Sequence, residues 1–408
     1  GIIDATPNPP GGSITRDAKG HATGFLEDAA SELVTPRGAP REENAAVLNL
    51  EAALKSMREA GVTSFLDAAE TPEGIAAYET VRAAGGLTAR AHVAVLTDAS
   101  GDKTPAELIA AAVALRDRYD HPQIAPTPDL RVHTAKLFMD GVIQAPAQTA
   151  GLVDPYWVPD AHGQWGPGTH RGPVYIEPGK LTETVVGLVK AGIDPHIHAI
   201  GDQAVKVALD ALTAGREAAA AAGRDIRPAI AHAELVDPVD YVRFAKLKVA
   251  PVMSYQWSIP GPNSVTGAKN YLGPDRFERM EPFDKLAAAG VPVVYGSDWP
   301  VARMNYWLAL KAGITRAGSK AIPAEFAGRL NHAPGLSRIA ALRSITINGA
   351  TSLHQDKDTG SIETGKLADI IVLQNNFLQV PEDDLDDNKV LLTLVGGRVV
   401  YDGGIKVP

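Results

Sequence analysis

Helix-like segments alternate with short apolar, strand-like segments along most of this 408-residue chain, and this alternation restricts the fold more than any other feature of the sequence. Apolar runs that end in Gly, Pro or Asp are typical of strands, and longer amphipathic segments are typical of helices. Repeated strand–helix units predict a parallel sheet, and this number of units favours a closed (β/α)8 barrel over a doubly wound sheet. We therefore expect an α/β fold of the TIM-barrel type.

The expected barrel strands lie at 62–67, 89–96, 131–139, 194–199, 229–232, 248–254 and 291–296, and the expected helices at 44–60, 73–84, 104–119, 181–191, 202–222, 237–246 and 283–289. A complete barrel has eight strands, so one strand is missing from this series. Because the chain opens in a segment rich in Gly and Pro with no strand before it, we expect the absent strand to be the first.

Both ends of the chain depart from the barrel repeat. Near 11–28 the pattern predicts a hairpin insertion that turns at Asp17 to Gly20. After a final helical region at about 305–354, strands of antiparallel type are expected at 368–373, 390–395 and 398–401. We accordingly assign 1–358 to the barrel and 359–408 to a separate set of C-terminal strands.

The composition restricts the class of ligand and the cellular compartment that we expect. The net charge of −9 argues against a nucleic-acid partner, because nucleic-acid-binding proteins display clustered Lys and Arg. No apolar run is long enough to span a membrane, and no signal-peptide pattern is present. The chain has no Cys, so a metal would be bound through nitrogen and oxygen, and the lack of disulfides fits a reducing compartment. We expect a cytoplasmic protein with a small-molecule substrate; the sequence leaves homo-oligomerisation open.

Four short apolar strands end in side chains that can bind a metal or transfer a proton. They contain Lys136 in Ala-Lys-Leu-Phe-Met-Asp-Gly, His198 in His-Ile-His-Ala-Ile-Gly-Asp, His232 in Ile-Ala-His-Ala-Glu and Asp298 in Gly-Ser-Asp-Trp-Pro. Barrel enzymes place their chemistry at the carboxyl ends of the strands, so these groups should converge at one rim. Imidazole suits Zn, Fe, Ni or Mn.

Each of these residues also has an ordinary structural explanation. Asp298 could be a metal ligand and proton shuttle, or the cap of a turn before Pro300. Lys136 could occupy an exposed strand position, or it could react with CO2 to become an anionic oxygen ligand that bridges two metals, because a buried free amine is costly. His196 and His198 form a His-x-His pair on one strand face. We prefer His198 as the ligand and assign His196, one layer deeper, to substrate binding.

Together these motifs resemble the amidohydrolase superfamily, and within it the amidohydrolase 3 group that includes YtcJ-like hydrolases and N-substituted formamide deformylases. The segments around Lys136, His198, His232 and Asp298 are similar to that group's fourth-, fifth-, sixth- and eighth-strand motifs. The tail, with Gly-Ser-Ile-Glu-Thr-Gly-Lys at 360–366, is similar to the segment that returns to a small β-sandwich. The resemblance thus implies that the C-terminal strands belong to a composite sandwich.

The resemblance also implies a mechanism, and it indicates that one of the family's motifs is missing from this chain. It implies cleavage of an amide, formamide or related C–N bond by a metal-bound hydroxide, with one or two divalent ions, most simply zinc, and Asp298 as the proton shuttle. Lys136, His198, His232 and Asp298 would be the metal ligands. The family also has a His-x-His on its first strand, which this chain lacks. We therefore expect a missing N-terminal segment of the same protein to be a partner of this chain.

Two other functions are compatible with the sequence. One is a catalytically silent amidohydrolase-like protein with a binding or regulatory role. The other is a glycosidase that uses Asp298 with Glu234 or Glu70 as its carboxylate pair, although ordinary polar contacts are the simpler explanation of both glutamates. Only the glycosidase should stay active when metals are removed. Loop aromatics such as Trp157 and Trp257 hint at an apolar substrate but do not identify it.

Overall fold

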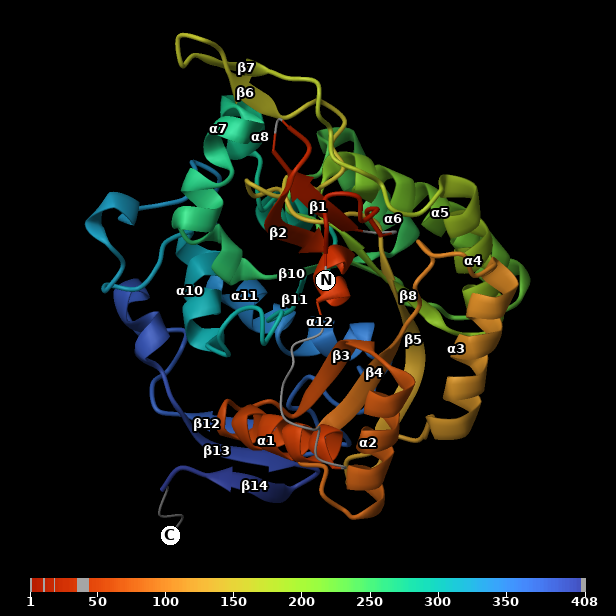
Figure 1. Ribbon diagram of the computed structural model, residues 1–408. Coiled ribbons are helices and arrows are strands. Elements are labelled where there is room, and N and C mark those ends of the chain that lie inside the picture. The colour runs from red at the N-terminus through yellow and green to blue at the C-terminus, as the bar shows by residue number, and fades with distance from the viewer. Residues whose placement is uncertain (1, 10–11, 18, 35–43, 405–408) are drawn as a thin grey trace.

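A curved sheet of seven parallel strands forms the centre of the molecule, in the spatial order β11-β10-β9-β8-β5-β4-β3 (Figure 1). The computed structural model describes residues 2–9, 12–17, 19–34 and 44–404. The central strands are β3 (Ser64–Glu70), β4 (Arg90–Leu96), β5 (Leu130–Phe138), β8 (Asp194–Ala199), β9 (Ala229–His232), β10 (Ala250–Met253) and β11 (Val294–Tyr295). This arrangement is a barrel of the TIM type that remains open on one side, and it confirms the expected fold and all seven expected strands.

Helices connect consecutive strands and cover the outer face of the sheet, as α3, α4 and α5 do beside β5 and β8 in Figure 1. Sequence signals fix where they begin. Thr104 caps α3 in a capping box with Glu107, and Thr71 caps α2 just before a proline. The barrel helices are α1 (Ala45–Glu59), α2 (Pro72–Ala83), α3 (Pro105–Tyr119), α4 (Pro178–Lys190), α5 (Asp202–Ala221), α6 (Tyr241–Leu247) and α9 (Phe283–Ala288). All were predicted, with ends displaced by a few residues.

The open side of the barrel lies between the edge strands β3 and β11. A cavity of about 1420 Å³ runs along both edges and continues past α11 (Arg338–Ser344) and α12 (Ile347–Ser352). Its walls include residues 64–67 of β3 and residues 294–298 at and after β11. A complete barrel would have one more strand at this place. The cavity therefore joins the carboxyl ends of the strands to the opposite end of the barrel.

Two long connections that the sequence suggested were loops contain regular structure. The first forms a hairpin of β6 (Trp157–Pro159) and β7 (Trp165–Pro167), and the second forms α7 (Lys269–Leu272) and α8 (Pro274–Glu278). They pack on each other: Trp165 meets Tyr271 edge to face, with 4.9 Å between ring centroids. Elements this short give too few repeats of a hydrophobic period to be seen in the sequence. Together they build one side of the rim.

The C-terminal strands form a separate antiparallel sheet, as expected, in the order β12-β13-β14. Its strands are β12 (Ile370–Leu373), β13 (Val390–Val395) and β14 (Arg398–Asp402). It is joined to the barrel by a buried ion pair in which Arg90 Nε lies 2.8 Å from Asp369 Oδ2. Thr393 Oγ1 also donates a 2.8 Å hydrogen bond to the Arg58 carbonyl at the end of α1. The exact boundary at 358 stays a prediction.

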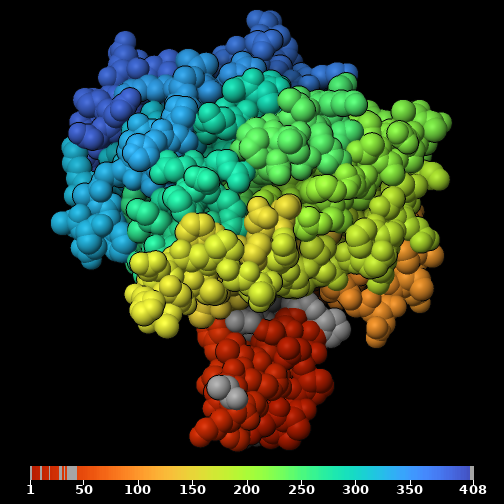
Figure 2. Space-filling model, turned by 90° about the horizontal axis from the view of Figure 1, so that it is seen from above, coloured from red at the N-terminus to blue at the C-terminus, as the bar shows by residue number. Residues whose placement is uncertain are grey.

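The predicted hairpin near the N-terminus is present as β1 (Gly12–Arg16) and β2 (Ala22–Asp28). The side chain of Asp17 accepts hydrogen bonds from the backbone N–H groups of Lys19 and His21, which fixes the turn. Figure 2 shows this N-terminal segment, in red, standing out from the body of the molecule. None of the helices in the described ranges is long and apolar enough to cross a membrane.

Candidate active site

The predicted rim residues are carried by adjacent parallel strands whose register sets their depth. Lys136 on β5 lies level with His196 on β8, and Phe138 lies level with His198. On the next strand, His232 pairs with Ala199. His196 and Lys136 therefore share a layer below His198, as the sequence suggested for His196.

His198 and His232 lie side by side, with 4.5 Å between ring centroids and an angle of 64° between the rings. His198 Nε2 is 3.2 Å from the carbonyl oxygen of Gly141, and His232 stacks on the indole of Trp257 at 5.1 Å. Burial, followed by the positive charge of Lys136, lowers the pKa of His198 to about 3. Both rings are nearly buried, and burial also holds the pKa of His232 well below its usual range. Both imidazoles are therefore neutral near pH 7 and can donate lone pairs.

Strained backbone marks two of the predicted ligands. His232 has a φ of 75° and Asp298 a φ of 51°, a region that residues with a β-carbon rarely occupy. Each such conformation costs on the order of 1–3 kcal/mol and tends to persist where the surrounding structure needs a side chain in a particular direction. The strain therefore supports a functional role for both residues.

Lys136 is a buried ammonium group with no partner. Its side chain is only 4% exposed, and among the described residues none accepts a hydrogen bond from its Nζ or forms an ion pair with it. The nearest feature is the ring of Phe138, whose centroid is 4.8 Å from Nζ. Burial lowers the pKa of Lys136 to about 8, and the charge of Asp298 opposes that shift only in part. The charged ammonium form is therefore energetically unfavourable here.

Carboxyl groups with raised pKa values surround the histidines. Burial raises the pKa of Asp298, and the positive charge of Lys136 opposes the shift. Glu234 is buried and has a pKa of about 7, because burial and the nearby Asp298 outweigh a 3.2 Å hydrogen bond from Gln144. Glu234 thus makes the ordinary polar contact that we expected, with Gln144, but its pKa also responds to the charge of Asp298.

Asp140 is a site residue that sequence reasoning overlooked. It is buried, and its carboxylate accepts backbone hydrogen bonds from Gly151, Ile200 and Gly201 at 2.8–3.0 Å. It also lies 3.5 Å from His198 Nε2. Burial outweighs the three hydrogen bonds and raises its pKa to about 8. Asp140 therefore positions the loop and the ring of His198. The sequence feature that could have identified Asp140 is its position in the same Lys-Leu-Phe-Met-Asp-Gly segment as Lys136.

Four of the predicted residues face the large cavity: Lys136, His196, His232 and Asp298 line it. Glu70 lines it from β3, where it accepts a 2.9 Å hydrogen bond from the backbone N–H of Thr71. Burial and the neighbouring Asp67 raise the pKa of Glu70 to about 7. A substrate in the cavity would therefore meet the histidines, the lysine and acidic groups together.

The rim ligands do not yet form a compact coordination sphere. Across the described ranges, a single group of three His, Asp or Glu residues has ligand atoms within 4.8 Å of one another, and it consists of His133, Asp194 and His354. The set His198, His232 and Asp298 does not meet that limit. The structure thus brings the two rim histidines into contact, while the roles of the rim residues as ligands stay predictions.

The fold is shared with solved structures. An uncharacterized metal-dependent hydrolase from Pyrococcus horikoshii has a similar structure, with a TM-score of 0.67 and 24% identity over 91% of this chain and 68% of that one. At that identity the similarity establishes the fold alone.

The sequence assigns the family directly. The model of the amidohydrolase family matches residues 1–401, so the chain belongs to that family. It is 25% identical to the putative amidohydrolase YtcJ of Bacillus subtilis over 98% of the chain and 70% of that protein. It is 27% identical to the N-substituted formamide deformylase of Arthrobacter pascens over 98% of the chain and 69% of that protein. The chain therefore spans about two thirds of the length of these relatives, and the predicted resemblance is confirmed.

Proposed function

We propose that this chain carries the site of a metal-dependent hydrolase that cleaves an amide, a formamide or a related C–N bond. The observation that carries the proposal is the pair of adjacent neutral histidines, His198 and His232, near the unpaired amine of Lys136. His232 and Lys136 line a large cavity. Neutral imidazoles packed together are suited to a metal rather than to a charge relay. The similarity to a formamide deformylase supports the choice of bond.

The rim residues fit a divalent metal of the zinc type. His232 Nδ1 is buried and has no hydrogen-bond partner, which is costly unless a ligand completes it. His198, His232 and Asp298 would hold the ion, and Lys136 would join them after carboxylation, which would remove its unfavourable positive charge. When bound, such an ion acts as a Lewis acid and lowers the pKa of coordinated water toward about 7.

The chain's own residues would perform the remaining steps. Asp298 would accept a proton at its carboxylate from the attacking water and pass it to the leaving amine. Asp140 would keep the ring of His198 in place through its backbone hydrogen bonds. His196, in the layer below, would contact the substrate where it reaches into the cavity.

The test is a hydrolysis assay of the purified 408-residue chain on a panel of N-substituted formamides and small amides. One sample is loaded with zinc, a second is stripped with a chelator, and a third is stripped and reloaded. We expect activity in the first and third samples only. Amide or formamide hydrolysis that survives stripping would contradict the proposal. Metal binding without hydrolysis of any substrate would favour a silent binding protein.

A further inference from the structure

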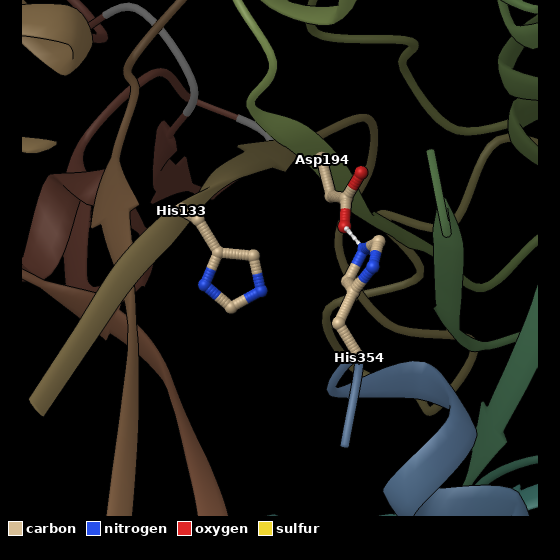
Figure 3. Close-up of side chains that lie close together, drawn as sticks. All are labelled: His133, Asp194 and His354. Atoms are coloured by element: carbon tan, nitrogen blue, oxygen red, sulfur yellow. Dashed lines mark hydrogen bonds and ion pairs between the residues drawn. The ribbon is translucent and has the colours of Figure 1, made fainter. Parts of the chain in front are cut away.

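A second group of metal-capable side chains lies at the opposite end of the same strands. His133 is on β5, three residues before Lys136, and Asp194 begins β8, four residues before His198. At about 3.3 Å per residue, each lies roughly 10–13 Å from the rim. His354 lies two residues after the end of α12 and completes the group (Figure 3). This cluster is therefore separate from the proposed catalytic site.

The three side chains already point toward a common centre. Their ligand atoms lie within 4.8 Å of one another. His354 Nε2 is 2.6 Å from Asp194 Oδ2, and the other carboxylate oxygen of Asp194 accepts a 3.0 Å hydrogen bond from the Arg227 backbone N–H. Figure 3 shows the ring of His133 directed toward this pair without joining it. The rings of His133 and His354 are 5.5 Å apart between centroids.

Asp194 and His354 satisfy each other's hydrogen-bonding groups, but His133 has no such partner among the described residues. Its side chain is only 7% exposed, its Nδ1 is buried without a partner, and no described residue forms a hydrogen bond with its ring. A buried polar group without a hydrogen bond costs about 1–3 kcal/mol. The rings of His92 and His354 meet the ring of His133 edge to face, at 5.4 and 5.5 Å between centroids, but neither gives its Nδ1 a hydrogen bond. A ligand would supply the missing partner.

The backbone at His354 gives independent support. Its φ is 57°, in the left-handed region that glycine usually occupies just after a helix. A glycine here would end α12 without strain, but only a side chain can reach Asp194. The strained backbone conformation thus places the imidazole of His354 beside Asp194.

The surroundings favour a cation. Arg131 on β5 lies near enough for its positive charge to act on His133, but a 2.8 Å ion pair with Asp120 neutralises part of that charge. Arg227 is likewise paired with Asp356. The carboxylate of Asp194 is shared by the ring of His354 and the backbone N–H of Arg227, and among the described residues no Arg or Lys side chain forms an ion pair with it. Two imidazoles and one carboxylate are a donor set for first-row transition metals rather than for Mg²⁺ or Ca²⁺.

We propose that His133, Asp194 and His354 form a second metal site, which binds a divalent ion of the zinc type and fastens β5, β8 and the end of α12 together. Ligand bonds to zinc are about 2.0–2.2 Å and the sites are tetrahedral, so donor atoms on one ion lie about 3.4 Å apart. The present limit of 4.8 Å would have to contract by up to about 1.4 Å at His133, and the hydrogen-bonded Asp194–His354 pair would have to open to admit the ion. Leu353 and Gln355, on either side of His354, line the large cavity, so the ion would also fix part of the cavity wall.

The test measures zinc binding after the rim donors have been removed. In the variant His198→Asn/His232→Asn, isothermal titration with Zn²⁺ should still show about one equivalent bound, and Co²⁺ should give the absorption of a nitrogen- and oxygen-ligated site. Adding His133→Gln and His354→Asn should weaken zinc binding by at least about tenfold, since even loss of an outer partner costs a metal site 10–100-fold. Asn tolerates the left-handed backbone at 354. These variants all lack both rim histidines, so the comparison between them does not depend on the hydrolase proposal.

A matched control carries the same rim changes together with His162→Gln and His332→Gln, two histidines whose side chains are exposed. It should bind zinc as the rim-deficient variant does, and circular dichroism should show that all three proteins are folded. Equal zinc affinity with and without His133 and His354 would overturn the proposal, as would no binding in the rim-deficient variant. If His133→Gln/His354→Asn does not fold, His354→Gly alone replaces it in the same titration.

Discussion

The two ends of the central strands carry similar side chains in opposite states of pairing. At the rim, Lys136 and His232 are buried without hydrogen-bond partners, and the carboxyl groups around them have raised pKa values. At the other end, Asp194 and His354 are joined at 2.6 Å, while Nδ1 of His133 and of the neighbouring His92 is unsatisfied. In barrels the carboxyl ends of the strands hold the chemistry and the amino ends hold the fold together. We therefore interpret the unpaired groups at the rim as the reactive site, and the paired Asp194 and His354 at the opposite end as a site that holds the fold together.

The largest effect that would sharpen this contrast is expected at Asp298. Asp298→Asn keeps the shape but cannot accept a proton, so kcat of the zinc-loaded chain should fall by about 10²–10⁴-fold, the range typical of a lost general base. Steady-state kinetics on the best formamide or amide substrate measure it. The control is Asp194→Asn at the opposite end, which should leave kcat within a few-fold. A small loss at Asp298 would refute its role as the proton shuttle.

The next effect concerns Lys136 and the stability of the metal-free chain. Its folded-state pKa of about 8, against 10.5 for a free lysine, means that the folded form binds the proton more weakly than the unfolded form. The free energy of unfolding should therefore rise with pH between about 8 and 10.5, by about 3 kcal/mol for one group. Below pH 8 the full cost is present. Lys136→Met should remove this pH dependence and stabilise the chain at pH 7, as urea unfolding would show.

Lys311 provides the matched control for that prediction. It is as buried as Lys136, but its Nζ is 2.8 Å from Asp386 and 2.9 Å from the carbonyl of Asp383. Lys311→Met leaves a carboxylate without its partner and should destabilise the chain by about 3–5 kcal/mol. The same substitution should thus have opposite signs at the two lysines. Equal destabilisation at both would show that Lys136 has a partner in solution.

The sequence predicted the barrel better than it predicted either group of side chains. The helix and strand periods of this chain are long enough to read locally, and Gly and Pro mark the ends of the elements. The residues after strands could be assigned to the rim because parallel strands end at one edge. The cluster of His133, Asp194 and His354 could not be found this way, since His354 follows a helix and comes near Asp194 only in the folded chain. The elements β6, β7, α7 and α8 were missed because they are too short to show a repeating hydrophobic pattern.

The smallest effect tests the anchoring end through His354 alone. In the metal-free chain, His354→Gly loses the hydrogen bond to the buried carboxylate of Asp194, which costs about 1.5–3 kcal/mol. It also relieves the left-handed backbone, which returns about 1–2 kcal/mol, so the free energy of unfolding should fall by about 1 kcal/mol. With zinc at a hundred times its dissociation constant, the parent chain should gain about 2.7 kcal/mol more than the variant, because a ligand that binds only the folded form stabilises it. Thermal unfolding with and without zinc, in chains that lack the rim histidines, measures both quantities. A variant stabilised by zinc as much as its parent would place the ion elsewhere, and the two ends of the strands would no longer differ in the way proposed.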